Sequence, residues 1–415
     1  MQHSLYLHIP FCIHRCGYCD FNTYAGLEAL IPGYVTALCS EIDWLAAHAP
    51  HPLEVHTVFF GGGTPSLLPA SQVERILETV ERAFALQPGA EITLEANPGT
   101  LSLEHLRLLH SLGVNRLSLG VQSAHPAELR LLERGHDYPD VIRSVTWARQ
   151  AGFDNLNLDL IFGLPEQALE TWQHTLELAL GLQPEHFSLY ALSLEHGTPF
   201  GRWAGRGLLS TPDPDAAAEM YEWASDRLEQ AGYTQYEISN WASTAPDGGL
   251  LACRHNLQYW RNLPYLGFGA GAHGYAGGLR TANVLSPRSY IDRFHLRREE
   301  PSDNVPINDT DDLPSDASPM QFPHTPATQT AQPIDRTAEI GETMMMGLRL
   351  VQEGVPGRRF SERFDQTLEQ VFDPQIDRLR DLGLLEWAVN DQGEPTLRLT
   401  HKGRLVGNQV FVEFI

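Results

Sequence analysis

The chain has 415 residues, 42% of them hydrophobic and 20% charged, and its formal net charge at pH 7 is −23. This length can bury the core of one large domain and a smaller second one. The acidic excess argues against a general binder of nucleic acid or anionic membranes, because phosphate surfaces would repel it. No apolar run approaches a membrane span, and the N-terminus shows no signal sequence. We therefore predict a cytoplasmic protein, with which peripheral membrane contact is compatible.

Short apolar segments alternate with amphipathic ones along the first half of the chain, which is typical of a parallel sheet with crossover helices. The predicted strands are Leu5–Ile9, His56–Phe60, Glu91–Glu95, Arg116–Leu119, Asn155–Ile161 and His186–Tyr190. The predicted helices between them are Ile31–Ala47, Ala70–Phe84, Leu103–Leu112, Pro139–Ala151 and Leu169–Leu180. Six such units predict an α/β fold, an open, partial (β/α)6 barrel within residues 1–240. Functional groups of such barrels lie at the C-terminal ends of the strands.

Three of the five cysteines stand close together after the first predicted strand, as Cys12, Cys16 and Cys19 in a C-x3-C-x2-C arrangement. Three thiolates at this spacing can hold three irons of a cubane and leave the fourth iron open to a small molecule. The alternatives are a structural zinc site, with His14 as the fourth ligand, or three buried thiols. This cysteine usage favours a reducing compartment and a metal site over a disulfide framework.

The cysteine stretch, with Tyr18 just before its last cysteine, resembles the radical S-adenosylmethionine (SAM) superfamily. Together with the sequence YLHIPFC at its start, it is similar to the family of oxygen-independent coproporphyrinogen III oxidase and its haem-chaperone relatives. The resemblance implies a [4Fe–4S] cluster on the three cysteines and SAM chelated to the open iron. It also implies that one-electron reduction cleaves the sulfonium to a 5′-deoxyadenosyl radical.

Two of the next strand ends carry sequence that suits the same ligand. Gly62, Gly63 and Thr64 belong to a GGGTP turn, whose glycines let the backbone approach a ligand closely. By resemblance, this turn meets the methionyl amino group of SAM. Glu95 ends the third strand, where a carboxylate can accept hydrogen bonds from two ribose hydroxyls, although a solvated strand end is the plainer interpretation.

Four further residues complete the SAM set that the resemblance implies. Gln122 follows the fourth strand and offers an amide donor and acceptor, while Arg134 could pair with the carboxylate of SAM through two hydrogen bonds. Asp159 lies within an apolar strand, where an unpaired carboxylate is costly, so we expect it to face the barrel mouth as a hydrogen-bond acceptor. Tyr6 matches the family tyrosine near the methionyl group.

A second motif, in residues 241–298, points to haem. Histidine and tyrosine are axial ligands of haem iron, and aromatic rings can stack on its flat macrocycle. A lone histidine beside aromatic residues is usually only packed, but the string His-Asn-x-x-Tyr-Trp resembles the haem-chaperone branch. This resemblance assigns haem binding to His255, Asn256, Tyr259 and Trp260. The glycine-rich segment Tyr265–Gly278 beyond it is expected to be a close-packed loop.

The remaining chain divides by composition. Residues 299–336 are rich in proline, acidic and small polar residues, so we predict a disordered acidic linker. In residues 337–415 the predicted helices are Ala338–Leu350, Ser361–Phe372 and Pro374–Leu382, and the predicted strands are Leu384–Trp387 and Thr396–Leu399. This pattern indicates a small winged-helix-like α+β domain. Such modules often bind DNA, but the acidic charge favours packing on the barrel, shaping a substrate pocket or forming a homodimer contact.

Two functions of different classes fit this organisation. One is a haem chaperone that delivers haem to acceptor proteins such as membrane respiratory enzymes; the other is coproporphyrinogen III dehydrogenase, which decarboxylates propionates oxidatively. Phe21 stands where the dehydrogenase pattern has a fourth cysteine, the cluster motif comes early in the chain, and the motif that begins at His255 belongs to the chaperone branch. All three features favour the chaperone. Radical methyl transfer is a third option, for which Cys253 is the only loose candidate for an extra reactive cysteine.

Overall fold

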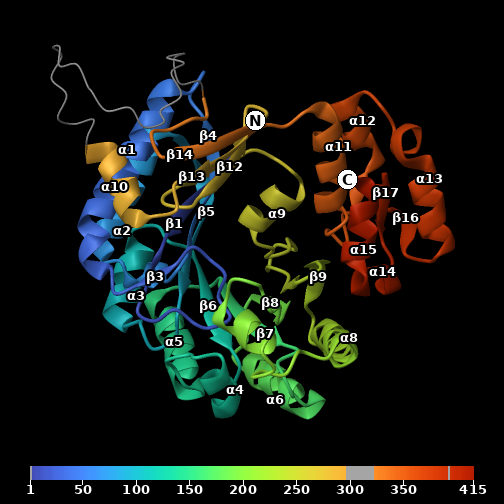
Figure 1. The fold of residues 1–415 in the computed structure, drawn as a ribbon, viewed down its shortest axis with the longest axis horizontal. Coiled ribbons are helices and arrows are strands. Elements are labelled where there is room, and N and C mark those ends of the chain that lie inside the picture. The colour runs from blue at the N-terminus through green and yellow to red at the C-terminus, as the bar shows by residue number, and fades with distance from the viewer. Residues whose placement is uncertain (1, 296–321, 391–392) are drawn as a thin grey trace.

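The structure, a computed structural model, describes residues 2–295, 322–390 and 393–415. A twelve-stranded sheet forms the larger domain, and a separate α+β domain follows it at the C-terminal end (Figure 1). The order of the strands is β14-β13-β12-β11-β1-β4-β5-β6-β7-β8-β10-β9, so within the described residues β14 and β9 are its edges and the sheet does not close on itself.

Six consecutive parallel strands form the centre of the sheet, as the sequence predicts. They are β1 (His3–Ile9), β4 (Glu54–Gly62), β5 (Ala85–Ala96), β6 (Arg116–Gln122), β7 (Leu156–Phe162) and β8 (His186–Ala191). Each predicted strand overlaps one of these. Because all six run in one direction, the residues that follow them gather at a single rim of the partial barrel.

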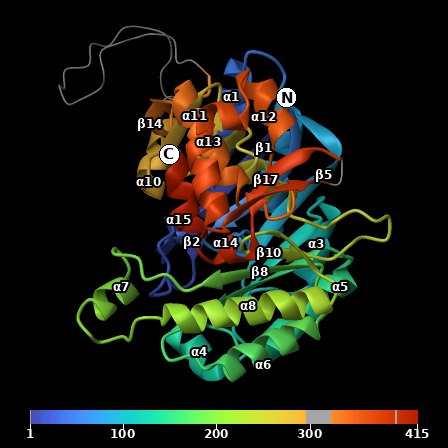
Figure 2. The same cartoon turned by 90° about the vertical axis from the view of Figure 1, so that its right-hand side faces the viewer.

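Helices connect these strands and cover the outside of the sheet. They are α1 (Ile31–His48), α2 (Ala70–Ala83), α3 (Leu103–Ser111), α4 (Pro126–Leu131), α5 (Tyr138–Ala151) and α6 (Leu169–Leu180). The five predicted helices are confirmed, and α4 is an additional short one. Local signals explain the bounds: a capping box of Asp137 and Asp140 begins α5, and Gly152, with φ of 105°, ends it. α8 (Pro214–Gln230) packs against α6 (Figure 2).

Antiparallel strands extend the sheet on both sides. β10 (Asn240–Ala242) and β9 (Thr234–Glu237) follow β8. On the other side, β11 (Tyr265–Phe268) runs parallel to β1, and antiparallel strands follow it: β12 (His273–Ala276), β13 (Leu279–Asn283) and β14 (Thr328–Pro333).

Two expectations for this part of the chain are wrong. The segment Tyr265–Gly278 is not simply a loop, because β11 and β12 form in it. Residues 322–336 do not continue a disordered linker, because β14 pairs with β13; the rest of that predicted linker, 299–321, lies outside the described residues. Both segments gain backbone pairing from distant strands, which composition alone cannot indicate.

The C-terminal domain has its own hydrophobic core, built around Met344, Phe360, Phe364 and Leu397. Its elements are α11 (Arg336–Gly347), β15 (Val355–Pro356), α12 (Gly357–Phe364), α13 (Leu368–Asp381), β16 (Leu385–Val389), β17 (Pro395–Leu399), α14 (His401–Leu405), α15 (Gly407–Phe411) and a 3-10 turn (Val412–Phe414). The predicted helices Ala338–Leu350 and Pro374–Leu382 are confirmed by α11 and α13, and the predicted strands are confirmed by β16 and β17. The predicted helix Ser361–Phe372 is wrong, because α12 ends at Phe364 and α13 continues past a kink at Phe372, two residues before Pro374.

Several shorter elements complete the fold. They are β2 (Phe11–Cys12), β3 (Tyr24–Ala25), 3-10 turns (Glu28–Leu30 and Pro65–Leu67), α7 (Pro199–Ala204) and α10 (Pro287–His295), which packs on α1. α9 (Arg254–Trp260), which contains the predicted haem motif, contacts both β4 and α11. Figure 1 shows this helix between the sheet and the C-terminal domain.

Candidate functional site

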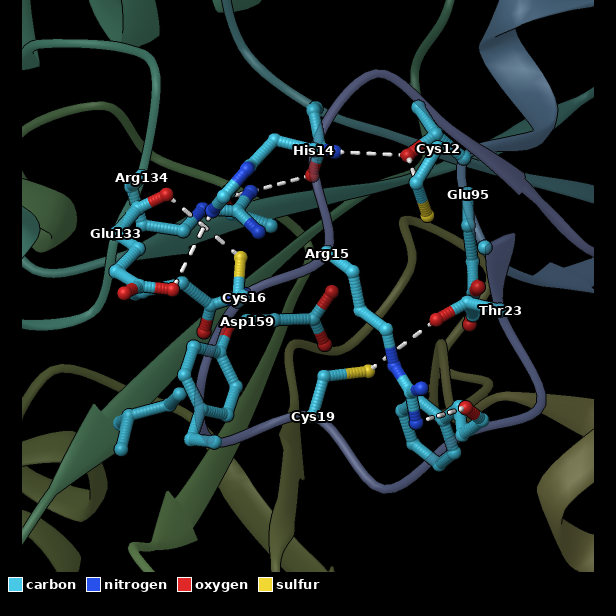
Figure 3. A pocket seen from close by; sticks show the side chains of 18 of the residues that line it. Cys12, His14, Arg15, Cys16, Cys19, Thr23, Glu95, Glu133, Arg134 and Asp159 are labelled. Atoms are coloured by element: carbon cyan, nitrogen blue, oxygen red, sulfur yellow. Dashed lines mark hydrogen bonds and ion pairs between the residues drawn. The ribbon is translucent and has the colours of Figure 1, made fainter. Parts of the chain in front are cut away.

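The three clustered cysteines open into one cavity. Cys12 ends β2, and Cys16 and Cys19 follow in the loop before β3, which turns because the Cys19 N–H donates to the Cys16 carbonyl at 3.1 Å. All three thiols are free and line a cavity of about 550 Å³ at the C-terminal rim of the parallel strands. Figure 3 shows their sulfur atoms around a common space. This arrangement suits a cluster that takes each thiolate on a separate iron.

The surroundings of two of the three thiols, those of Cys12 and Cys16, favour the neutral form. The Cys12 sulfur lies 3.7 Å from the hydroxyl of Thr64, and the Cys16 sulfur lies 3.8 Å from the carbonyl oxygen of Glu133. Burial raises the pKa of the Cys12 and Cys16 thiols. Because iron binds thiolates, loading a cluster here must release protons.

The zinc alternative has no support in this geometry. His14, its proposed fourth ligand, points to Glu133, with 3.3 Å between His14 Nε2 and a carboxylate oxygen, and its side chain is 62% exposed. Among the described residues, no group of three or more His, Cys, Asp or Glu side chains is arranged to hold a single metal ion.

The strand ends that the sequence singled out meet at the cysteine cavity. Its wall includes Gly62, Gly63, Thr64, Glu95, Gln122, Arg134 and Asp159. These residues come from the C-terminal halves of β4 to β7 and the loops after them, so the parallel sheet brings together positions almost 100 residues apart in the chain. Their location at one cavity is confirmed, while their contacts with SAM stay a prediction.

Two partly buried carboxyl groups give this cavity its electrostatic character. Glu95 accepts a hydrogen bond from the Gly62 N–H at 3.1 Å, and burial together with nearby Asp159 raises its pKa to about 8. Asp159 accepts hydrogen bonds from Ser118 Oγ at 2.8 Å and Asn157 Nδ2 at 2.9 Å, and burial also raises its pKa. A cationic ligand is therefore favoured here, since it stabilises both carboxylates.

Arg134 has a partner that the sequence did not suggest. Its Nη2 donates to the Gly120 carbonyl at 2.8 Å and to the side-chain oxygen of Asn97, which lines the same cavity. Its buried Nε has no hydrogen-bond partner among the described residues. Gln122 has a φ of 66°, at an irregularity in the pairing of β6 with β7. A left-handed non-glycine residue at a cavity wall is typical of a functional site. Asn97 could have been suspected only from its place two residues after Glu95.

Tyr6 lies elsewhere than its family position suggests. It does not line the cysteine cavity but a smaller one of about 190 Å³, and its hydroxyl lies 3.0 Å from His8 Nδ1. The two cavities are neighbours because Glu95, Asp159 and Tyr190 line both. The smaller cavity is below the range of about 300–1,000 Å³ that is usual for small-molecule sites.

The predicted haem motif forms the floor of this smaller cavity. His255, Asn256 and Tyr259 of α9 line it. α9 is held on the N-terminal side of the sheet by Glu91, which accepts hydrogen bonds from the N–H groups of Arg254 and His255 at 3.0 and 3.1 Å. The motif is thus a short helix beneath the cofactor cavity, a placement that local sequence could not give.

His255 is 1% exposed, and both of its ring nitrogens are engaged. Its Nδ1 lies 2.8 Å from Thr57 Oγ1, whose hydroxyl donates to Ser4 Oγ at 2.6 Å, so Nδ1 carries the proton. The lone pair of Nε2 then accepts from the Tyr259 hydroxyl at 2.8 Å. Burial lowers the pKa of His255 to about 3, so the ring is neutral. Iron ligation by His255 stays a prediction and requires Nε2 to be released.

Trp260 lies on the other side of the motif. Its ring packs against Arg349 of the C-terminal domain, with 4.5 Å between the guanidinium carbon and the ring centroid, and it does not line either of the two cavities. In this arrangement the four motif residues do not face one common site.

Comparison with known proteins matches both domains. Residues 6–179 match the radical SAM superfamily, and residues 334–406 match the HemN C-terminal domain. A Bacillus subtilis protein named heme chaperone HemW is 37% identical over 415 residues, which cover 99% of each chain. The chain belongs to the HemW family. HemW of Escherichia coli is 40% identical over 303 residues, covering 71% of this chain and 77% of that protein.

A solved structure shows the same fold as this HemW-family chain. It is coproporphyrinogen III oxidase (HemN) of Escherichia coli, with a TM-score of 0.76 and 24% identity, covering 99% of this chain and 89% of that one. The family resemblance predicted from the cysteine and haem motifs is confirmed. No helix in the described parts of the chain is long and apolar enough to cross a membrane.

The radical SAM domain implies a [4Fe–4S] cluster and SAM, and the residues present fit both. Three thiols border one cavity, two partly buried carboxyl groups beside them favour a cation, and Arg134 leaves a buried donor without a partner among the described residues. The thiols suit iron, which binds soft sulfur ligands. The two carboxyl groups suit the sulfonium of SAM, and the Arg134 guanidinium suits its carboxylate.

Proposed function

We propose that this protein is a haem chaperone, which binds haem together with a [4Fe–4S] cluster and SAM and passes the haem to acceptor proteins. The observation that carries the proposal is the full-length similarity to proteins named heme chaperone HemW, with a complete His-Asn-x-x-Tyr-Trp string in this chain. Acceptors are proposed among membrane respiratory enzymes, which the protein would meet peripherally.

Cys12, Cys16 and Cys19 would hold the cluster, and Gly62, Glu95, Arg134 and Asp159 would hold SAM beside it. When bound, this pair supplies one-electron cleavage of a sulfonium. The protein's own residues position the ligand: Gly62 fixes the Glu95 carboxyl group, and Asn97 fixes Arg134. Phe21, at the place of the fourth cysteine in the dehydrogenase pattern, is 63% exposed and offers no further ligand.

Haem would be held through His255, the neutral histidine of the motif. Its protonated Nδ1 is fixed by Thr57, so the free lone pair is on Nε2, the nitrogen suited to iron. The structure presents this nitrogen to Tyr259 rather than to an open site, so haem binding includes a rearrangement of α9.

Two assays on the anaerobically reconstituted protein test the proposal. The first measures consumption of coproporphyrinogen III with SAM and a low-potential reductant, and we expect none at catalytic rates. Conversion to protoporphyrinogen at such rates would contradict the chaperone function and support the dehydrogenase function.

The second assay titrates haem and follows its Soret band. We expect His255→Ala to lose the haem spectrum of the wild type, whereas His51→Ala, a change of an exposed histidine, should retain it. Equal haem retention in all three proteins would exclude His255 as the ligand.

A further inference from the structure

The haem-motif helix α9 has two opposite faces, each bound to a different part of the protein. Residues four apart on a helix are about 40° apart around its axis, and residues five apart are about 140° apart. His255 and Tyr259 therefore share the face toward the barrel, and Trp260 points toward the C-terminal domain. A single flat haem cannot contact His255 and Trp260 together while this helix stays in place.

The barrel face is closed around His255. Besides Thr57 and Glu91, the helix is fixed by Gln258, whose amide donates to the carbonyl oxygens of Gln2 at 3.1 Å and Pro264 at 2.7 Å. The cavity that His255 lines has a volume of only about 190 Å³. Haem access to this histidine thus requires the helix to move away from the sheet.

The C-terminal domain holds the other end of the helix. Arg261, one residue past it, makes an ion pair with Glu353, at 2.6 Å from Nη2 and 3.1 Å from Nε. Asn262 Nδ2 donates to Thr343 Oγ1 at 3.0 Å. Arg349 stacks on Trp260 at 4.5 Å and lies 5.6 Å from the Phe411 ring. The barrel contacts therefore restrain α9 itself, and the domain contacts restrain its last residue, Trp260, and the two residues that follow it.

This junction leaves buried polar atoms unsatisfied. Trp260 Nε1, Arg349 Nε and Glu237 Oε2 are buried and have no hydrogen-bond partner among the described residues. Such groups are rare in a native structure, and each disfavours the arrangement that buries it. An arrangement in which water reaches these atoms would remove that cost.

We propose that the C-terminal domain controls haem access to His255 by holding α9 against the barrel, with Glu353 and Arg349 as the positioning residues of this hold. The inference rests on the proposed haem function and names its regulation. Trp260 then serves as the attachment of the helix to the domain, and loss of the domain contacts increases the fraction of molecules whose helix can accept haem.

Arg261→Ala in the full-length, cluster-loaded protein tests the hold. Loss of one partly buried ion pair should raise the opening equilibrium about 2- to 5-fold, and the apparent Kd for haem should fall by the same factor, because it scales inversely with the competent fraction. The first readout is hydrogen exchange of residues 254–260 without haem, and the second is a Soret titration with haem.

Matched variants make the result specific. Arg227→Ala removes a two-bond ion pair with Glu177 between α8 and α6 and should change neither readout. Arg280→Ala removes the ion pair with Glu342, which joins the C-terminal domain to β13 without involving α9. This variant separates a general loosening of the C-terminal domain from the specific loss of its contact with Arg261. Glu353→Gln replaces Arg261→Ala if the latter does not fold.

The two readouts keep this inference apart from the proposed function. Faster exchange at α9 with unchanged or weaker haem binding overturns the inference, as does a haem affinity that rises equally in Arg227→Ala. If the wild type binds no haem while α9 still opens faster in Arg261→Ala, the proposed function is wrong and only the mechanical hold remains.

Discussion

The hydrogen bond from Tyr259 to His255 predicts an uncommon result: Tyr259→Phe should improve haem binding while it lowers stability. The hydroxyl occupies the lone pair of His255 Nε2 at 2.8 Å, in competition with iron. Burial raises the pKa of Tyr259, so the hydroxyl stays a proton donor throughout the neutral range. Phenylalanine keeps the ring, which packs edge-on against His255 at 4.9 Å, and removes only the donor.

The magnitude follows from the loss of one partner by a buried nitrogen. Leaving such an acceptor unsatisfied costs about 1–3 kcal/mol. This cost falls on the haem-free state, since in the haem-bound state Nε2 would be on iron. Each 1.4 kcal/mol is a tenfold change in an equilibrium constant, so haem affinity should rise about 5- to 140-fold. The free energy of unfolding should fall by the same 1–3 kcal/mol.

Denaturant unfolding and Soret titration of the same preparations measure the two effects. Tyr233→Phe is the control, because it also removes a hydroxyl that donates to a buried acceptor, the Pro184 carbonyl at 2.6 Å, but far from His255. In a His255→Ala background the gain in haem affinity should vanish. A folded Tyr259→Phe protein with unchanged or weaker haem binding refutes the assigned competition for Nε2.

Three further predictions concern other parts of the molecule. Cys16→Ser should abolish the iron–sulfur absorbance after reconstitution, whereas Cys39→Ser, a buried cysteine of α1, should retain it; equal iron content in both would remove Cys16 from the cluster. SAM affinity should rise with pH up to about 8, because the sulfonium cation favours the ionised form of Glu95. Calorimetry of SAM binding at pH 7 should therefore detect the release of close to one proton from Glu95. In Glu95→Gln the SAM affinity should depend less on pH. Glu41→Gln should lower the free energy of unfolding by about 3 kcal/mol, since this buried carboxylate accepts four hydrogen bonds, and an unchanged denaturation midpoint would contradict its structural role.

The barrel was predictable because its signals are local. Alternating apolar strands and amphipathic helices give the order of elements, and capping residues such as Asp137 and Gly152 fix helix ends. Parallel strands then bring their C-terminal ends to one rim, so Glu95 and Asp159 could be placed at one cavity with Cys12 before any geometry was known.

Non-local pairing set the limit of this approach. β11 forms in a glycine-rich segment because β1 offers a partner edge, and Gly269 is needed there, since a Cβ would lie 2.5 Å from the Tyr34 hydroxyl. Asn97 was missed because its role is to hold Arg134, 37 residues away. The burial of His255 depends on Thr57 and Glu91, neither of which is near it in sequence.

The length of the haem-motif helix links these contacts to the proposed release of haem. α9 has seven residues, whereas isolated helices shorter than about 12–15 residues are marginal in water, so tertiary contacts must supply its stability. Glu91 and Gln258 supply them on the barrel side, and Glu353 and Arg349 supply them through the C-terminal domain. A helix stabilised from outside responds to each of these contacts, unlike the 18-residue α1, which has nine buried residues of its own. A ligand or acceptor that displaces the C-terminal domain would therefore act directly on the histidine, with no need to deform the sheet.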